Sequence, residues 1–420
     1  MTPLAGCPSL VRGVAIAVAM AAAIPPPPAA AADPDAAPAD AWPMARGCLA
    51  GTGRSAATLG FPLVEAWRRD FGGTPFTAVP VIADGTIYVG DLEGRFHAID
   101  LATGETRWTC RLDEAGFPSA AAVAADPALP LVVGDDLGVV RGLDRRTGEV
   151  VWQFTTEGEI SGGPTILETA TGPCVLVGSQ DATLSCLEIA TGTKRWQHAI
   201  ADQIRCSPTV ARTAAGDRIF LAGCDGRLHV IDAADGREVA AIEIGGPTGT
   251  TPAVSGSRVV FGTEGGSFFA IDFLEAAVAW QMQPAAGAPA YRSSAAVADG
   301  LAIVGTRGRA VEALEIADGR RRWRHPMRGR VDASPVVVTA AGTAADPAAP
   351  PRPVAIIADA KGTVAALDAA SGEPVWEFEA GGGFAAGGAV AAGRVVLAAD
   401  DGVVWCFRSA GEAAADRSGQ

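Results

Sequence analysis

The phrase DLATGETRW, which runs from Asp100 to Trp108, decides the fold because it recurs along the chain. It returns as DRRTGEVVW (144–152), EIATGTKRW (188–196), DAADGREVA (232–240), DFLEAAVAW (272–280), EIADGRRRW (315–323) and DAASGEPVW (368–376). The last residues of these phrases are 44, 44, 44, 40, 43 and 53 residues apart. A period of this size is typical of a radial or solenoid array, in which one unit cannot bury its own apolar face.

Each repeat predicts four antiparallel strands. Large and small apolar residues alternate before each phrase, as in Phe96 and Ala98, which is typical of a strand packed between neighbouring sheets. Two further strands are expected upstream, one from a run of small residues such as 161–164 and one from a β-branched run such as 86–90. Four strands in about 44 residues match a propeller blade.

Two residues of the phrase have expected structural roles. The glycine supplies the positive φ of a tight turn, and the tryptophan ring seals the gap to the adjacent blade. The glycines are Gly104, Gly148, Gly192, Gly236, Gly319 and Gly372. The tryptophans are Trp67, Trp108, Trp152, Trp196, Trp280, Trp323 and Trp376.

The two ends of the repeat region complement each other. The final repeat, 401–407, stops before any turn and tryptophan, whereas residues 63–67 supply a tryptophan strand with no blade before it. We therefore predict an all-β, eight-bladed propeller of four-stranded antiparallel blades, in which the N-terminal strand completes the last blade. Closing the ring removes the strand edges that an open array would expose.

The phrase resembles the repeat of the pyrroloquinoline quinone (PQQ) propeller family. Ala98, Asp100, Thr103, Gly104 and Trp108 fit its pattern A-x-D-x-x-T-G-x-x-x-W, and 42–47 (WPMARG) resembles the W-P-x-x-R-G lead-in of secreted members. The likeness spans roughly residues 42–408 and implies the propeller fold. It leaves the function open, because the family includes quinoprotein dehydrogenases and non-catalytic propellers such as the lipoprotein of the outer-membrane protein assembly machinery.

Two repeats depart from the family pattern. Ala240 replaces a tryptophan, and Glu275-Ala276 replaces the Thr-Gly turn, which puts the packing of the fourth and fifth blades in question.

The chain outside the repeats predicts export. Arg12 precedes the apolar run 14–24, and 29–32 offers small residues for cleavage, so we expect a signal peptide at 1–32. A disordered lead and N-terminal segment is expected at 33–60, the propeller at 61–408 and a flexible tail at 409–420. The protein is then periplasmic or secreted, with no transmembrane segment in the mature chain. Lipidation at Cys7 is not expected, because no apolar region precedes it.

Charge and histidines restrict the partners. The net charge of −14 argues against nucleic acid or anionic lipid as the main partner and is typical of a soluble protein. We expect a monomeric propeller. The chain has four histidines, His97, His198, His229 and His325, at repeat-equivalent positions in different blades. Such positions are spread around the ring, so we do not expect all four to meet and predict no metal site.

The candidate binding site is the mouth of the central channel. One inner-strand position per blade holds Thr77, Ser119, Ser161, Arg205, Gly249, Arg292, Asp332 and Ala385. Arg205 and Arg292 are predicted to clamp a carboxylate, with Asp332 paired to Arg292. Tyr291 and Phe384, one position earlier, are expected to line the mouth. A solvated channel with internal ion pairs remains the alternative.

Two functions remain open. The favoured one is a non-catalytic scaffold that binds a protein or peptide partner in the cell envelope, with a role in envelope protein assembly and no cofactor. It rests on the short loops, since the 339–353 insertion is the main exception. The alternative is a dehydrogenase that binds PQQ with Ca²⁺. It is disfavoured because no two cysteines are adjacent and the inner ring holds a single carboxylate, Asp332.

Overall fold

A computed structural model of the chain describes residues 1–2, 35–112, 115–284, 287–341 and 350–411. The chain divides into two compact units, Met1–Ala32 and Asp33–Gln420, and the described strands all lie in the second. The predicted signal peptide, most of the predicted tail and residues 342–349 of the insertion lie outside the described residues.

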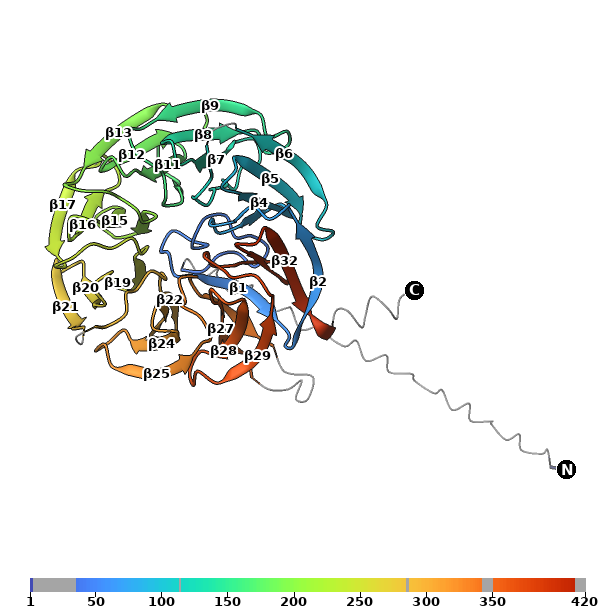
Figure 1. Ribbon diagram of the computed structural model, residues 1–420. Coiled ribbons are helices and arrows are strands. Elements are labelled where there is room, and N and C mark those ends of the chain that lie inside the picture. The colour runs from blue at the N-terminus through green and yellow to red at the C-terminus, as the bar shows by residue number, and fades with distance from the viewer. Residues whose placement is uncertain (3–34, 113–114, 285–286, 342–349, 412–420) are drawn as a thin grey trace. The chain divides into compact units, whose positions relative to one another are not determined.

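The second unit is an eight-bladed β-propeller, as predicted (Figure 1). Six blades consist of consecutive strands, blade 7 carries β1 as an added strand, and blade 8 combines the last three strands with β2. By blade, the strands are: blade 1, β3 Val81–Ala83, β4 Thr86–Gly90, β5 Arg95–Asp100, β6 Thr106–Arg111; blade 2, β7 Leu131–Gly134, β8 Val139–Leu143, β9 Val150–Thr155; blade 3, β10 Thr165–Leu167, β11 Cys174–Gly178, β12 Thr183–Glu188, β13 Lys194–Ala199; blade 4, β14 Thr209–Ala211, β15 Arg218–Ala222, β16 Arg227–Asp232, β17 Glu238–Glu243; blade 5, β18 Ala253–Ser255, β19 Arg258–Gly262, β20 Phe268–Asp272, β21 Ala277–Met282; blade 6, β22 Ala296–Ala298, β23 Leu301–Thr306, β24 Ala310–Glu315, β25 Arg321–Pro326; blade 7, β26 Val336–Ala340, β27 Arg352–Ala358, β28 Thr363–Asp368, β29 Pro374–Glu379; blade 8, β30 Ala389–Ala391, β31 Arg394–Ala398, β32 Val403–Ser409, β2 Leu63–Asp70.

Within a blade, the strands run antiparallel from the channel to the rim. In blade 2 the bridge between Ala122 and Val132 stands in place of an innermost strand. The third strand of each blade is almost wholly buried, because blades pack on both of its faces; Phe96 and Ala98 of β5 are both 0% exposed. Among the described residues, no helix has the length and apolar character needed to cross a bilayer.

The ring closes as predicted. β2 pairs antiparallel with β32, from Leu63 opposite Ser409 to Asp70 opposite Val403. The N-terminal strand therefore forms the outer edge of blade 8.

Small inner-strand residues connect neighbouring blades. The backbone N–H of Ser207 donates to Thr251 Oγ1 at 3.1 Å, that of Thr251 to Ser294 Oγ at 2.9 Å, and that of Ser294 to Ser334 Oγ at 2.9 Å. Short hydroxyl side chains thus satisfy backbone donors that have no partner within their own blade.

Residues 37–59, which we call the collar, correct the prediction of a disordered lead. Within the part predicted to be disordered, Ala37 is 0% exposed and bridges to Ser55. At its other end, β1 (Arg54–Leu59) adds to blade 7, parallel to β26. Composition suggested disorder for 33–40, where Ala37 is buried instead. The rest of the collar also buries apolar side chains against the blades, among them Trp42 at 0% exposure.

The collar bonds to one blade after another. Backbone N–H groups at the inner strands donate to its carbonyls; the pairs are Ile82 to Trp42, Val123 to Pro43, Val210 to Leu49, Val254 to Ala50, Val297 to Thr52, Val337 to Gly53 and Ala392 to Ala39. These donors belong to blades 1, 2, 4, 5, 6, 7 and 8. The collar therefore follows the ring and ties its inner strands together.

Candidate functional site at the channel mouth

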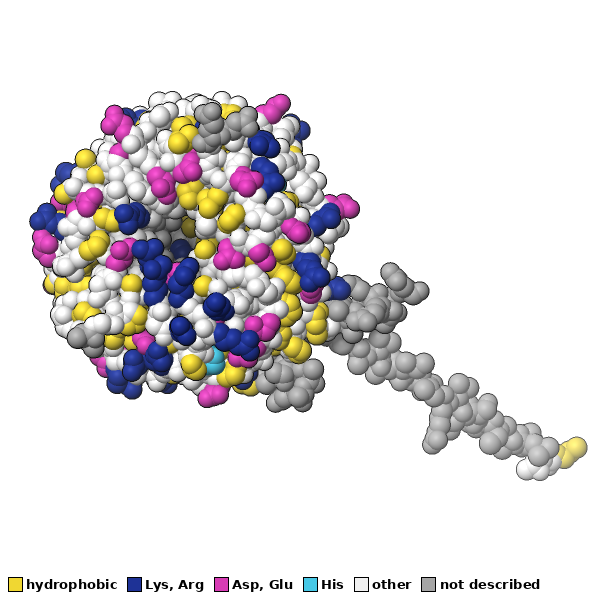
Figure 2. Space-filling model, in the orientation of Figure 1, with side chains coloured by type: hydrophobic (Ala, Val, Ile, Leu, Met, Phe, Trp, Pro, Cys, Tyr) yellow, Lys and Arg dark blue, Asp and Glu magenta, His cyan; other side chains and the backbone are white. Residues whose placement is uncertain are grey.

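The central channel holds a cavity of about 190 Å³. Its wall includes Thr77, Ser161, Arg205, Gly249, Arg292, Asp332 and Ala385, so the structure places these inner-strand residues on the channel as expected. Ser119 is buried and does not line it. The collar contributes Ala45 and Arg46 to the same wall. Figure 2 shows Lys and Arg side chains gathered beside the hollow at the centre of the ring.

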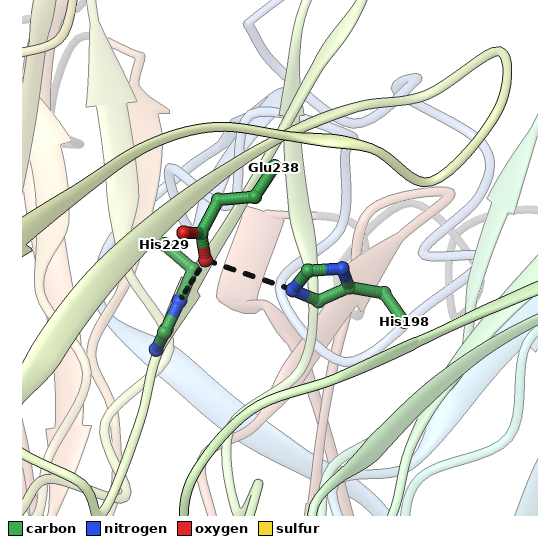
Figure 3. Close-up of side chains that lie close together, drawn as sticks. All are labelled: His198, His229 and Glu238. Carbon is green, nitrogen blue, oxygen red and sulfur yellow. Dashed lines mark hydrogen bonds and ion pairs between the residues drawn. The ribbon is translucent and has the colours of Figure 1, made fainter.

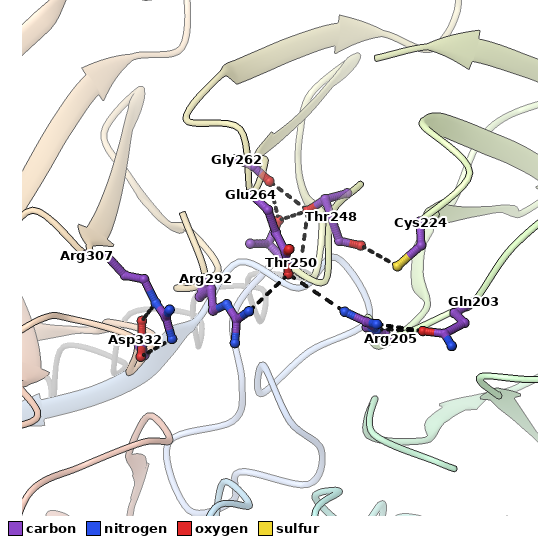
Figure 4. Close-up of polar contacts among 10 residues, drawn as sticks. All are labelled: Gln203, Arg205, Cys224, Thr248, Thr250, Gly262, Glu264, Arg292, Arg307 and Asp332. Carbon is purple, nitrogen blue, oxygen red and sulfur yellow. Dashed lines mark hydrogen bonds and ion pairs between the residues drawn. The ribbon is translucent and has the colours of Figure 1, made fainter. Parts of the chain in front are cut away.

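Arg205 and Arg292 converge on one carboxylate (Figure 4). Arg205 Nη1 lies 3.8 Å and Arg292 Nη2 lies 3.5 Å from the same oxygen, Oε1 of Glu264. Arg205 also donates from Nε and Nη2 to Gln203 Oε1, at 2.9 and 2.7 Å. The arginine side chains are 40% and 48% exposed, so the pair remains accessible to solvent. Sequence reasoning missed Glu264, because it lies in the loop between β19 and β20 rather than on an inner strand.

Asp332 does not pair with Arg292 as predicted. Arg307 holds it through two hydrogen bonds, Nε to Oδ1 at 2.9 Å and Nη2 to Oδ2 at 3.1 Å (Figure 4). Arg330 Nε donates to Oδ2 at 2.9 Å. The reason is geometric, because Arg307 presents its guanidinium fork from the β23–β24 turn and matches both carboxylate oxygens. These bonds to Asp332 raise the pKa of Arg307.

Tyr291 and Phe384 do not line the mouth, which corrects a second expectation. They are 4% and 1% exposed, and both belong to the packed core. Tyr291 packs edge-on to Phe268, with ring centroids 5.4 Å apart, and its hydroxyl donates to Glu312 Oε2 at 3.3 Å. Burial raises the pKa of this phenol. Successive side chains of an extended chain point to opposite sides, so a residue next to one that faces the channel points between blades.

The mouth carries more positive than negative charge. Four arginines, Arg205, Arg292, Arg307 and Arg330, share two carboxylates, Glu264 and Asp332. Below them Arg46 is 5% exposed and donates from Nη2 to two backbone carbonyls, those of Ala295 and Pro335, both at 3.0 Å. Burial lowers the pKa of Arg46 to about 10. The cationic mouth stands out in a chain whose net charge is −14.

The described lining does not fit PQQ with Ca²⁺. Calcium takes about 6–8 oxygen ligands, many of them from carboxylates. Asp332 is the one carboxylate among the cavity-lining residues that the structure describes, and two arginines already hold it. The cavity is also smaller than the roughly 300 Å³ at which pockets for ligands of such size begin.

Two of the four histidines meet outside the channel, a pairing that sequence reasoning did not predict. His198 of β13 and His229 of β16 lie on adjacent blades, with ring centroids 6.4 Å apart, and Glu238 of β17 lies beside both (Figure 3). His198 and His229 occupy different positions of the repeat, and they come together because the outer strand of one blade faces the flank of the next.

Structural comparison finds the same fold in proteins of different activity. BamB from Moraxella catarrhalis has a TM-score of 0.66 at 16% identity, over 83% of this chain and 100% of that one. Quinohemoprotein alcohol dehydrogenase from Comamonas testosteroni has a TM-score of 0.69 at 14% identity, over 87% and 80%. A europium-containing methanol dehydrogenase has a TM-score of 0.68 at 12% identity, over 88% and 98%. At these identities the likeness shows the fold alone.

Sequence comparison is more specific about the family. No curated protein matches the chain significantly. The family model described as "Outer membrane protein assembly factor BamB", a PQQ-type repeat, matches residues 64–137, 136–215, 209–340 and 337–413. These matches cover the propeller from β2 to β32. The chain therefore belongs to the family of PQQ-type repeat propellers that carries this BamB description.

Proposed function

We propose that this protein is a non-catalytic binding scaffold of the cell envelope whose channel mouth binds an acidic segment of a partner protein. One observation carries the proposal: Arg205 and Arg292, both about half exposed, face a single Glu264 oxygen at 3.8 and 3.5 Å. Neither distance is that of a good charge-assisted hydrogen bond, which is about 2.7–2.9 Å. Both guanidinium groups therefore retain donors for an incoming carboxylate.

The surrounding charge supports the same conclusion. Arginine binds carboxylates through two parallel N–H donors. Two arginines on blades 4 and 6, on either side of the blade 5 loop that carries Glu264, suit an Asp or Glu side chain or a chain terminus. The excess positive charge at the mouth attracts acidic groups, while the net charge of −14 repels them elsewhere. An acidic peptide is thereby steered to the mouth.

The family supports an envelope role. The family model is described as an outer-membrane protein assembly factor, and BamB is among the structural relatives. We infer that this propeller works in the periplasm or outside the cell, in protein assembly at the envelope. The sequence of residues 1–32 predicts the export that this location requires.

The test is the binding of a fluorescent peptide rich in Asp and Glu, followed by fluorescence anisotropy. We expect Arg205→Glu/Arg292→Glu to weaken binding by at least about tenfold, since hydrogen bonds to charged groups contribute about 1.5–3 kcal/mol each. The matched control is Arg146→Glu/Arg237→Glu, which makes the same change in net charge at two exposed turn residues outside the channel lining. Equal weakening in both variants would show a non-specific charge effect and would contradict the proposal.

A second measurement addresses the dehydrogenase alternative. Calorimetric titration of PQQ, with Ca²⁺ present, into the folded protein should give no binding heat, because the channel lining supplies too few carboxylates. Micromolar or tighter binding at a single site would overturn the non-catalytic assignment.

A further inference from the structure

Three potential metal ligands converge at the junction of blades 3 and 4, outside the channel lining (Figure 3). His198 lies on β13, the outer strand of blade 3, whereas His229 and Glu238 lie on β16 and β17 of blade 4. Glu238 Oε2 lies 2.7 Å from His229 Nδ1 and 3.7 Å from His198 Nε2. One ligand atom from each residue falls within 4.8 Å of the other two.

The potential metal ligand on blade 3, His198 Nε2, has no hydrogen-bond partner. His198 Nε2 is buried without one, and its distance to Glu238 is too long for a hydrogen bond. A buried polar atom without a partner is unfavourable, and native structures seldom leave one unsatisfied. An ion placed between the three side chains would give this nitrogen the partner that it lacks.

The histidine on blade 4, His229, is oriented by a carboxylate on the side of its ring away from Glu238. His229 Nε2 lies 3.0 Å from Asp225 Oδ2, and both side chains are only 5% exposed. A histidine that ligates a metal usually donates its other N–H to a carboxylate, which fixes the tautomer and turns the free nitrogen toward the metal. Here that free nitrogen is Nδ1, the atom facing Glu238.

A glycine, Gly223, makes room for the carboxylate of Asp225. Gly223 donates its N–H to Arg227 O at 2.9 Å, as Asp91 does to Arg95 O in blade 1, so the two positions are equivalent. A Cβ at Gly223 would lie 2.5 Å from Asp225 Oδ1. Blade 4 thus lacks the aspartate of blade 1, and Asp225 occupies the space beside His229.

We propose that His198 Nε2, His229 Nδ1 and Glu238 bind a Zn²⁺ ion that joins blades 3 and 4, with Asp225 as a positioning residue. Two imidazoles and one carboxylate form a known type of zinc ligand set, which leaves a fourth position for water or for a partner's side chain. Tetrahedral bonds of about 2.0–2.1 Å place ligand atoms about 3.3 Å apart. The 2.7 and 3.7 Å separations lie on either side of that value, and the side chain of Glu238 is 38% exposed and free to adjust.

The contacts of His229 select the tautomer that a metal needs. Its two ring nitrogens face two carboxylates, Nε2 toward Asp225 and Nδ1 toward Glu238. Zn²⁺ requires Nδ1 as a lone-pair donor, so His229 binds it with the proton on Nε2, where it donates to Asp225.

The test uses tag-free protein, freed of metal by a chelator, and a titration of Zn²⁺ against a chromophoric competitor. We expect one tight site per chain and a higher melting temperature with Zn²⁺. Loss of an outer-shell partner in Asp225→Asn should weaken Zn²⁺ by about 10–100-fold, and His198→Gln should weaken it more. Co²⁺ substitution should give the absorption spectrum of a tetrahedral ion with nitrogen and oxygen ligands.

The control comes from the repeat itself. His325 follows Trp323 by two residues, as His198 follows Trp196, but it lies in blade 6 away from the cluster. His325→Gln should leave the affinity for Zn²⁺ unchanged. The proposal is overturned if no tight site is found, if His198→Gln binds as the unmodified protein does, or if both variants lose Zn²⁺ equally. Matching circular dichroism of the metal-free variants ensures that lost affinity does not reflect lost folding.

Discussion

At the scale of single residues, the aspartate, glycine and tryptophan of the repeated phrase each have an identifiable role. Asp100 Oδ1 accepts the backbone N–H groups of Ala102 and Thr103, at 3.0 and 2.9 Å, which closes the turn. A hydrogen bond from Arg107 holds the pKa of Asp100 below its usual range. Gly104 adopts φ +73°, and a Cβ there would lie 2.7 Å from the ring of Trp67. The glycine is therefore required both by the turn and by the tryptophan of the preceding blade.

The same contact recurs around the ring. At every such turn glycine, a Cβ would lie 2.4–2.7 Å from the indole of the preceding blade; the pairs are Gly104–Trp67, Gly148–Trp108, Gly192–Trp152, Gly236–Trp196, Gly319–Trp280 and Gly372–Trp323. The indole N–H also donates across the gap, as from Trp108 Nε1 to Arg145 O at 3.0 Å. Each of these six indoles therefore packs over the turn of the next blade.

The missing tryptophan of blade 4 explains why blade 5 can lack the turn glycine. Ala240 of blade 4 stands where a tryptophan would cover the turn of blade 5, and that turn has Ala276 in place of glycine, at φ +50°. Because no indole lies over the turn, a methyl group fits there. Phe273 and Ala240 pack on the same hydrophobic cluster, and Phe273 lies 4.9 Å from Phe220 between ring centroids. The doubt about these two blades is thereby resolved.

This pairing predicts opposite tolerance at two equivalent positions. Gly148→Ala should lower the free energy of unfolding by about 1–3 kcal/mol, because it combines a left-handed backbone with a clash against Trp108. Ala276→Gly should change it by less than about 1 kcal/mol, since relief of backbone strain offsets the greater freedom of the unfolded chain. Chemical unfolding of both variants is the measurement, and a Gly148→Ala protein as stable as the original would contradict the argument.

At the scale of elements, the strands were predictable and the collar was not. Strands β3 to β32 follow the repeat, because each must present apolar side chains to two neighbours. The collar has no period, and its order depends on bonds from the inner side of seven of the eight blades, whose residues lie far apart in sequence. For the same reason, Arg205 and Arg292 were placed from the repeat, whereas Glu264 and Arg307, which lie in connecting loops, were missed.

We predict that Arg46 anchors the collar. Arg46→Met keeps much of the side-chain volume but removes the donors to Ala295 O and Pro335 O. Amide hydrogen exchange at Val297 and Val337, whose N–H groups bond to Thr52 and Gly53 of the collar, should then quicken by at least about tenfold, the effect of about 1.4 kcal/mol of local stability.

Two controls accompany that measurement. Exchange at Leu187, within β12 and away from the collar, should not change. Unchanged rates at Val297 and Val337 would show that the collar is held by its backbone bonds alone.

At the scale of the whole ring, the N-terminal segment joins three blades. β1 extends blade 7, β2 completes blade 8, and Trp67 of β2 covers Gly104 of blade 1 and donates to Leu101 O at 3.0 Å. The ring is therefore closed noncovalently within blade 8, where β2 pairs with β32, whereas the chain from 71 to 80 connects β2 to β3 of blade 1. Closure of the ring brings the inner strands together around the channel. The collar and the charged mouth both depend on this convergence, because both are built from residues at the inner strands.

Loss of Trp67, on the strand that closes the ring, should therefore expose β2 to proteolysis, whereas loss of the equivalent Trp323 should not. Trp67→Ala and Trp323→Ala each remove a half-buried ring that lies over a turn glycine and donates to a carbonyl, and each should cost up to about 3 kcal/mol. We expect only the first to loosen β2, whose one strand partner among the described residues is β32. β25, in contrast, continues its own blade from β24 through a short turn. Limited proteolysis followed by mass spectrometry should show early cleavage within 60–72 in Trp67→Ala and not in Trp323→Ala. Identical cleavage patterns would mean that β2 and β32 hold the ring closed without the indole.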